Sequence, residues 1–249
     1  MEDLAQVLQS PTALMIAAGL AVILFLFVTL HLFASGPRGA SVLIVGPSDA
    51  GKTTLFLQLR DRSTGKGTVA SMQPNEADIK LPSDKPSARP IHIIDIPGHP
   101  RLRTVFDVHA PSARGVVFLV DSVDFMPKKS EVAEQLYDVI THPVIAGRRV
   151  PVLLACNKAD AGVKAHTVDF IRKRLEKEID AMRSTRGALG GDGAASQAAL
   201  LAGASGESFS FERLGMVGKG PVVSCAAVSA LDAGGVADVE AFMRKCVKA

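Results

Sequence analysis

The chain has 249 residues, of which 47% are hydrophobic, and its 28 Lys and Arg residues against 25 Asp and Glu residues give a formal net charge of +3. This length suits one α/β domain of ordinary size with additional segments. Because no basic run is interleaved with aromatic residues, direct nucleic-acid binding is not expected. Cys156, Cys225 and Cys246 lack metal-ligand spacing, so we interpret them as reduced thiols.

The first predicted element is a membrane-spanning helix at residues 13–33. Residues 4–37 contain no Asp, Glu, Lys or Arg, and 21 helical residues span roughly 30 Å, the thickness of a bilayer's hydrocarbon core. The alternative, a cleaved signal peptide, fits poorly because the start is acidic and the apolar run is too long. Arg38 is the first basic residue, which predicts a single pass with 1–12 as a short lumenal tail and the body in the cytosol. The lipid bilayer is therefore an expected partner through 13–33.

Residues 38–249 are predicted to form one α/β domain with a mostly parallel sheet and helices on both faces, because apolar runs alternate with helical periods. Buried strands are expected at 41–45, 91–96, 115–120, 151–156 and 221–227. In residues 76–81 polar and apolar side chains alternate strictly, which predicts a half-exposed antiparallel edge strand paired with 91–96.

Helices are expected after these strands, at 53–60, 131–141, 168–186 and about 236–247. Gly, Ala and Ser make up 16 of the 22 residues in 187–208, which predicts a disordered surface insertion. The following stretch SFSFERL, residues 208–214, is interpreted as a short extra strand.

A phosphate-binding loop is indicated by the sequence GPSDAGKT at residues 46–53, which fits GxxxxGK[ST]. It follows a predicted strand and opens a predicted helix, where backbone N–H groups and the helix dipole hold phosphate oxygens. Lys52 is expected to reach the β- and γ-phosphates, and the Thr53 hydroxyl to ligate Mg²⁺. The expected nucleotide contacts in this region are Gly46, Asp49, Ala50, Gly51, Lys52, Thr53 and Thr54.

The base is indicated by the sequence NKAD at residues 157–160, directly after a predicted strand. The Asp160 carboxylate can accept two hydrogen bonds from the N1–H and exocyclic amine of guanine, whereas adenine would leave it unsatisfied. Asn157 is expected to brace the loop, and the Lys158 stem to cover one face of the base. Backbone contacts to the guanine carbonyl are expected from Ser229, Ala230 and Leu231, with 224–226 as the rival segment.

A third motif, DIPGH at residues 95–99, ends another predicted strand. Asp95 is expected to hold Mg²⁺, usually through water, and the Gly98 N–H to sense a γ-phosphate. Glycine also allows this segment to move when that phosphate leaves. The sequence therefore predicts GTP or GDP with Mg²⁺ as the ligands.

In this order and spacing, the motifs resemble those of Ras-type small GTPases over about residues 40–247. The amino-terminal span, Asp49, DIPGH, and the segments SARGVVFLVDS and LLACNKAD resemble most the family of signal recognition particle receptor beta subunits. The resemblance implies a P-loop GTPase fold of the Ras and Arf type. It also implies a single-pass protein of the endoplasmic reticulum membrane that holds the receptor's alpha subunit when GTP is bound, during co-translational targeting.

Two site assignments follow only from this resemblance. Small GTPases place a Thr hydroxyl in the first switch to complete the Mg²⁺ shell, and here Ser71 is favoured, with Thr68 as the alternative. His99 stands where most relatives have a Gln that orients the attacking water. It can do similar catalytic work if it turns inward; turned outward, it leaves hydrolysis slow without a partner. No arginine finger within the chain can be identified, which favours slow intrinsic turnover.

The alternative function is a membrane-tethered, Arf-like signalling GTPase of vesicle traffic, whose output is hydrolysis. Such proteins usually start with a reversible amphipathic or myristoylated segment, whereas Met1 here is followed by Glu2 rather than Gly. His99 and the permanent anchor also favour a docking module that is gated by GTP.

Overall fold

The computed structural model describes residues 40–62, 71–82, 89–98, 103–189, 201, 208–216, 220–232 and 234–248, with four isolated helical residues, Met15, Gly19, Ala21 and Phe25. The chain divides into the units Met1–Arg38 and Gly39–Ala249. Among the described residues, none of the helices combines the length and the apolar character that a bilayer crossing needs. The predicted tail at 1–12 and nearly all of the predicted span at 13–33 lie outside the described residues, so both stay predictions.

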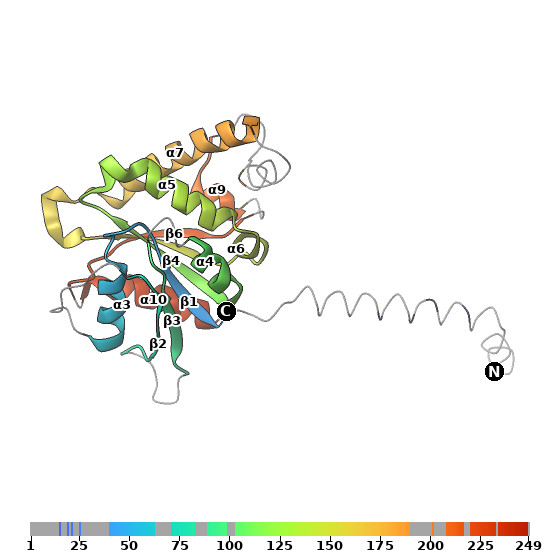
Figure 1. Cartoon of the computed structure of the whole chain (residues 1–249), viewed down its shortest axis with the longest axis horizontal. Helices are drawn as coiled ribbons and strands as arrows, with labels where there is room; N and C mark the ends of the chain where they lie inside the picture. Colours follow the sequence, from blue (N-terminus) through green and yellow to red (C-terminus); the bar gives the residue numbers. More distant parts are fainter. Residues whose placement is uncertain are drawn as a thin grey trace. The chain divides into compact units, whose positions relative to one another are not determined.

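A six-stranded sheet organises the unit Gly39–Ala249 (Figure 1). Its order is β2-β3-β1-β4-β5-β6, and its strands are β1 (Ser41–Val45), β2 (Asn75–Ile79), β3 (Ile91–Asp95), β4 (Ala113–Asp121), β5 (Val152–Asn157) and β6 (Val223–Ala227). All neighbouring strands are parallel except β2 and β3, which are antiparallel. The predicted mostly parallel sheet with one antiparallel edge strand is confirmed.

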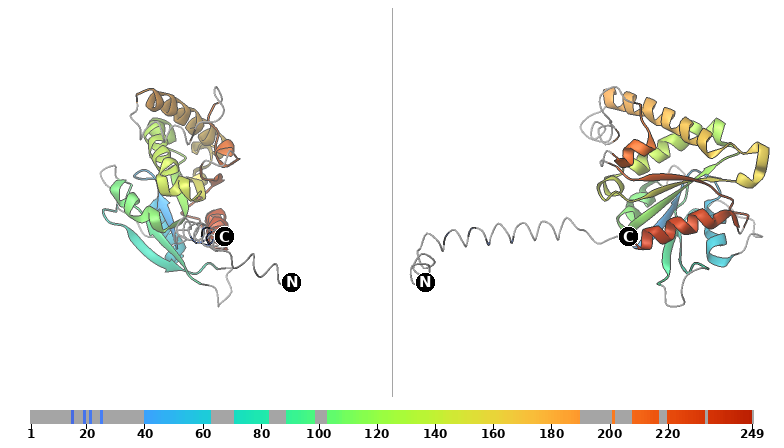
Figure 2. Two further views of the ribbon diagram at one scale, coloured as in Figure 1. Left: turned by 90° about the vertical axis from the view of Figure 1, so that its right-hand side faces the viewer. Right: turned by 180° about the vertical axis from the view of Figure 1, so that it is seen from behind.

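Helices cover both faces of the sheet (Figures 1 and 2). They are α3 (Lys52–Asp61), α4 (Arg103–His109), α5 (Phe125–Thr141), α6 (Pro143–Gly147), α7 (Val168–Leu189), α9 (Phe211–Met216) and α10 (Ala237–Lys248), with short 3₁₀ turns η2 (Ala110–Ser112), η3 (Ala159–Lys164) and η4 (Gly234–Val236). Successive side chains of a strand point to opposite faces. Accordingly, Leu43 packs with the α5 and α7 side, and Val42 and Ile44 pack with α3 and α10.

The stretch SFSFERL was predicted as a strand, and this is wrong: residues 211–216 form the helix α9. Two carboxylates of α7 explain the difference. Glu176 accepts a hydrogen bond from the backbone N–H of Phe211, and Asp180 accepts one from the N–H of Phe209. Because acceptors for the free N–H groups stabilise a helix start, a contact from far along the chain decides the local structure.

The predicted insertion at 187–208 lies mostly outside the described residues. Helix α7 continues through Leu189, three residues beyond the predicted end. Leu201 is buried in the core on the α7 side, and its carbonyl oxygen accepts a hydrogen bond from Nη1 of Arg183. For the remaining residues of the segment, disorder stays a prediction.

Candidate nucleotide-binding site

The predicted site residues gather where the parallel strands end. In the sheet register, Ile44 of β1 lies opposite Asp95 of β3, and Asp121 of β4 lies opposite Asn157 of β5. Ligands of open α/β sheets bind outside these carboxyl ends. The sheet therefore brings the phosphate loop, the 95–98 segment and the NKAD motif to one edge.

The phosphate loop ends at Gly51, the residue that precedes α3. Its φ of 87° lies in the left-handed region, and an added Cβ would stand 2.3 Å from Nδ2 of Asn157. Only glycine fits there. No side chain caps α3, so the N–H groups of its first turn face the loop as donors for an anion.

Lys52 is held inside the loop that it follows. Its buried Nζ donates a hydrogen bond of 2.8 Å to the carbonyl oxygen of Pro47. Burial lowers the pKa of Lys52, although the nearby Asp95 and Asp49 carboxylates act to raise it. The ammonium group is therefore partly desolvated and directed at the place where phosphate oxygens are expected.

Gly98 brings the segment after β3 against the phosphate loop. A Cβ at this position would stand 2.4 Å from Nζ of Lys52 and 2.6 Å from the carbonyl oxygen of Gly46. A larger residue would displace either the lysine or the loop. The backbone of 96–98 thus lies within contact of the ammonium group that is expected to hold the terminal phosphate.

Three predicted metal ligands meet beside Lys52. Oγ1 of Thr53 donates a hydrogen bond of 2.7 Å to Oδ2 of Asp95, and it lies 3.1 Å from Oγ of Ser71. Asn75 of β2 completes the group by donating to both Asp95 and Ser71, at 3.1 Å and 3.2 Å. The sequence indicated the first three residues, whereas Asn75 was missed.

The donor set fits a hard divalent cation. Oδ1 of the fully buried Asp95 has no hydrogen-bond partner among the residues that the structure describes, whereas Oδ2 has two. Burial raises the pKa of Asp95, an effect opposed by the hydrogen bonds from Thr53 and Asn75 and by the charge of Lys52. An unpaired buried carboxylate oxygen beside two hydroxyls is the all-oxygen environment that Mg²⁺ prefers.

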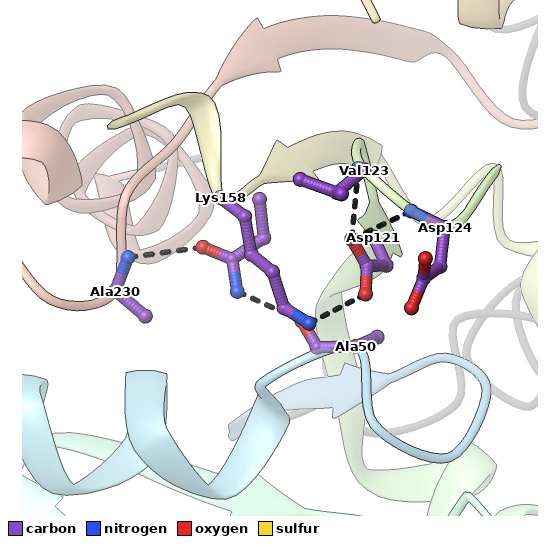
Figure 3. A network of polar contacts seen from close by, with 7 residues as sticks. Ala50, Asp121, Val123, Asp124, Lys158 and Ala230 are labelled. Atoms are coloured by element: carbon purple, nitrogen blue, oxygen red, sulfur yellow. Dashed lines mark hydrogen bonds and ion pairs between the residues drawn. The ribbon is translucent and has the colours of Figure 1, made fainter. Parts of the chain in front are cut away.

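Asn157 joins three segments of the chain (Figure 3). Its Nδ2 donates a hydrogen bond of 2.8 Å to the carbonyl oxygen of Ala50, and its Oδ1 accepts one of 2.9 Å from the N–H of Ala230. The side chain is buried, so both bonds are shielded from water. Asn157 therefore fixes the phosphate loop and the Ser229–Leu231 loop to the end of β5.

Lys158 is positioned by Asp121, a residue that the sequence analysis missed. Its Nζ donates to Oδ2 of Asp121, while Oδ1 accepts hydrogen bonds from the N–H groups of Val123 and Asp124 (Figure 3). Burial raises the pKa of Asp121, but the bonds from Lys158 and from the two N–H groups outweigh it and lower the pKa overall. The available signal was a carboxylate at the end of an apolar strand, the same signal that identified Asp95.

Asp160 lies beside the loop after β6. Oγ of Ser229 donates a hydrogen bond of 2.6 Å to Oδ1 of Asp160. Ser229 and Ala230 are buried, whereas Leu231 is 58% exposed. The structure thus brings together all six residues predicted around the base, and it places them at the end of β5 and on the segments that follow β5 and β6: Asn157, Lys158, Asp160, Ser229, Ala230 and Leu231.

Two predicted positions lie outside the described residues: His99 and Thr68. The catalytic role of His99 stays a prediction. Ser71, the favoured alternative for the Mg²⁺ site, is the hydroxyl that lies beside Thr53.

Comparison with known proteins decides the family. The family model for the signal recognition particle receptor beta subunit matches residues 38–217, which is more than half of the chain. The chain belongs to this family. The signal recognition particle receptor subunit beta of Rattus norvegicus is 35% identical over 96% of this chain and 89% of the relative. The Homo sapiens subunit is 32% identical over 96% and 88%.

Solved structures agree with membership of the signal recognition particle receptor beta-subunit family. A chain of the mammalian SRP receptor matches with a TM-score of 0.68 and 32% identity, over 83% of this chain and 99% of that chain. The small GTPase Arl6 of Trypanosoma brucei, solved with the nucleotide analogue GppNp, matches with a TM-score of 0.57 and 18% identity over 83% and 96%. The second match shows the fold alone, which is that of Ras- and Arf-like GTPases.

Proposed function

We propose that this beta subunit binds GTP or GDP with Mg²⁺ and, in its GTP form, holds the alpha subunit of the signal recognition particle receptor at the endoplasmic reticulum membrane. Family membership supports the receptor role, because the curated relatives are named as beta subunits of that receptor. The observation that carries the nucleotide assignment is the Asn157 side chain, which builds the phosphate loop and the base-reading loops into one site.

Guanine is recognised at the loops after β5 and β6. The Asp160 carboxylate accepts hydrogen bonds from the N1–H and the exocyclic amine of the base. The hydroxyl of Ser229, which also donates to Asp160, holds the carboxylate in position. Lys158, held by Asp121, lays its aliphatic stem along the ring. A site built around such polar contacts rejects bases that cannot make them.

The loop before α3 would hold the phosphates, with Mg²⁺ beside them. Lys52 exchanges its bond with the Pro47 carbonyl for bonds with the β- and γ-phosphates. Thr53, Ser71 and Asp95 would hold the metal, with Asp95 acting directly or through water. Bound there, Mg²⁺ neutralises phosphate charge.

The terminal phosphate acts as the switch through two neighbouring segments. Gly98 lies against Lys52, and Ser71 lies against Thr53, so both segments adjoin the place of the γ-phosphate. Contacts with that phosphate order the two segments, and the ordered surface holds the alpha subunit. Hydrolysis is slow without a partner, and residues 13–33 anchor the chain in the membrane.

The Arf-like signalling alternative has less support. The ADP-ribosylation factor-like protein 6 of Caenorhabditis briggsae is 28% identical over 52% of this chain, compared with 96% coverage by the rat beta subunit. The docking role is therefore preferred.

The proposal is tested with the full chain in nanodiscs, loaded with GDP or with a non-hydrolysable GTP analogue and titrated with purified alpha subunit. We expect at least about tenfold tighter binding in the GTP-like state, a common size for coupling between two sites. Asp160→Asn loaded with xanthosine nucleotides is the matched control and should restore the difference. Equal affinity in both states would reject gating.

A further inference from the structure

A second polar surface lies at the opposite end of the strands from the nucleotide site. The parallel strands begin in register there, with Ser41 opposite Ala113 and Val152 opposite Val116 and Val223. Helices α6 and α9 and the C-terminal end of α10 lie on the same side of the domain, the right in Figure 1 and the left in the rear view of Figure 2. This side carries several basic side chains.

Two of them are the adjacent residues Arg148 and Arg149, after α6. Nη1 of Arg148 donates a hydrogen bond of 2.7 Å to the carbonyl oxygen of Pro111, and Nη2 of Arg149 donates one of 3.0 Å to that of Gly215. Both side chains are exposed. A guanidinium has five N–H donors, and each of these exposed arginines uses one of them in the bond described, so other donors face solvent.

Arg114 and Lys245 extend the basic surface. Arg114 sits at the irregularity where β4 begins. A Cβ at the next residue, Gly115, would stand 2.5 Å from Sγ of Cys246, so the start of β4 lies against the end of α10 that carries the exposed Lys245. Among the described residues, Arg114, Arg148, Arg149 and Lys245 form no ion pair with a carboxylate.

Two acidic residues of neighbouring helices contact other side chains. Asp107 of α4 faces His142, and Glu212 of α9 pairs with Arg172.

Two large apolar side chains stand exposed beside these cations. Met216 at the end of α9 is 83% exposed and Val222 before β6 is 52% exposed. Met216 and Val222 lie close together, because Gly215, which precedes Met216, approaches Val222. The carbonyl oxygen of Gly215 also accepts the hydrogen bond from Arg149. Exposed apolar groups among unpaired cations are the composition of surfaces that bind the headgroup region of a bilayer.

We propose that this basic face, defined by Arg114, Arg148, Arg149, Met216, Val222 and Lys245, rests on an anionic lipid surface. The inference rests on the proposed anchor at 13–33. The chain enters the domain at this face, because Ala40 leads directly into β1. An acidic protein surface is the competing occupant, but it would not account for the placement of the patch beside the entry of an anchored chain.

The contact gives the domain an orientation. With the starts of the strands against the headgroups, their carboxyl ends and the nucleotide site face away from the membrane, toward a soluble partner. Each Lys or Arg near an anionic surface contributes about 1 kcal/mol, equivalent to about fivefold in the contact equilibrium. The attraction is screened by salt within a Debye length of about 8 Å.

The test uses the full chain carrying Met216→Cys, labelled with an environment-sensitive fluorophore and reconstituted into nanodiscs of phosphatidylcholine with or without phosphatidylserine. Spin-labelled headgroups should quench the label in the anionic discs, and high salt should reverse the quenching. Arg148→Gln/Arg149→Gln should weaken the contact about 25-fold, because each charge contributes about fivefold to the contact equilibrium. The matched control, Lys173→Gln/Lys177→Gln on exposed positions of α7, should leave it unchanged.

Equal quenching in neutral and anionic discs, or equal loss in the control variant, would overturn the proposal. So would shielding that arises only when the alpha subunit is added, which would assign the face to a protein. Resistance to alkaline extraction and GTP binding are measured on the same samples. If the chain is inserted and binds GTP but shows no dependence of quenching on lipid charge, only the proposed lipid contact of the basic face is refuted. Failure of insertion or of GTP binding refutes the proposed function.

Discussion

The base-facing and phosphate-facing halves of the site differ in how their polar side chains are held. In the base half, the side-chain oxygen and nitrogen of Asn157 both form buried hydrogen bonds. Lys158 donates a hydrogen bond to Asp121, and Asp160 accepts one from Ser229. In the phosphate half, Lys52 bonds a carbonyl of its own loop, and Asp95 keeps one buried oxygen unpaired. The first half is preorganised, whereas we expect the second to exchange its bonds when nucleotide and metal bind.

The largest effect is expected from Asp160→Asn, which reverses the hydrogen-bonding character of the preorganised half. The amide cannot accept both guanine donors but can pair with xanthine, so the preference for GTP over XTP should fall on the order of 10⁴-fold. Competition binding with the full chain measures it. Retained GTP preference would remove Asp160 from the base pocket.

Truncating Asn157 in the base half and Asn75 in the phosphate half compares how much each half contributes to the free energy of unfolding. Asn157→Ala leaves the buried carbonyl of Ala50 and the N–H of Ala230 without partners, at about 1–3 kcal/mol each, so the free energy of unfolding should fall by about 2–6 kcal/mol. Asn75→Ala removes part-buried contacts and should cost about 1 kcal/mol. Urea unfolding of the full chain in detergent measures both, and equal losses would contradict the difference in preorganisation.

Asp95→Asn probes the unpaired carboxylate. Mg²⁺-dependent GTP affinity should fall at least about tenfold, because a ligand or its immediate support is lost. The folded-state pKa of Asp95 is raised, so its ionisation opposes folding. Without Mg²⁺ and nucleotide, this group should make unfolding easier as pH rises above the ordinary value of 3.8.

The difference in unfolding free energy between wild type and Asp95→Asn, measured across that pH range, isolates this contribution. The variant should lack it. If the free energy of unfolding of the wild type instead rose relative to that of Asp95→Asn as pH increases, its protein partners would be stabilising the ionised carboxylate without a metal.

The smallest effect on nucleotide binding is expected from Asp121→Asn, which loosens Lys158 while keeping the shape of the side chain. GTP and GDP affinities should both fall about tenfold, since one charge-assisted bond is weakened and the base half is common to both ligands. Isothermal titration of each nucleotide measures it. A loss confined to GTP would place Asp121 in the phosphate half.

Sequence motifs anticipated the parts of the site that one short segment supplies. The loop before α3, the end of β3 and NKAD each combine a chemical group with a strand or helix terminus, so their meeting follows from parallel strand order. The roles of Asn75 and Asp121 were not predicted, because they depend on contacts with Asp95 and Lys158, which lie elsewhere in the chain. The helix α9 was not predicted for the same reason: Glu176 and Asp180, which accept hydrogen bonds from the N–H groups of Phe211 and Phe209 at and just before its start, lie on α7.

Hydrogen–deuterium exchange on the full chain in nanodiscs tests the central claim most directly, comparing the GDP state with the Mg²⁺-bound state of a non-hydrolysable GTP analogue. Peptides covering 71–79 and 91–98 should gain protection in the GTP-like state, because Ser71 and Gly98 lie beside Thr53 and Lys52, where we expect the terminal phosphate. Peptides covering 152–160 and 223–232 should be unchanged, since the base half is common to both ligands. Equal changes in the two halves, or changes confined to the base half, would contradict a switch driven from the phosphate side.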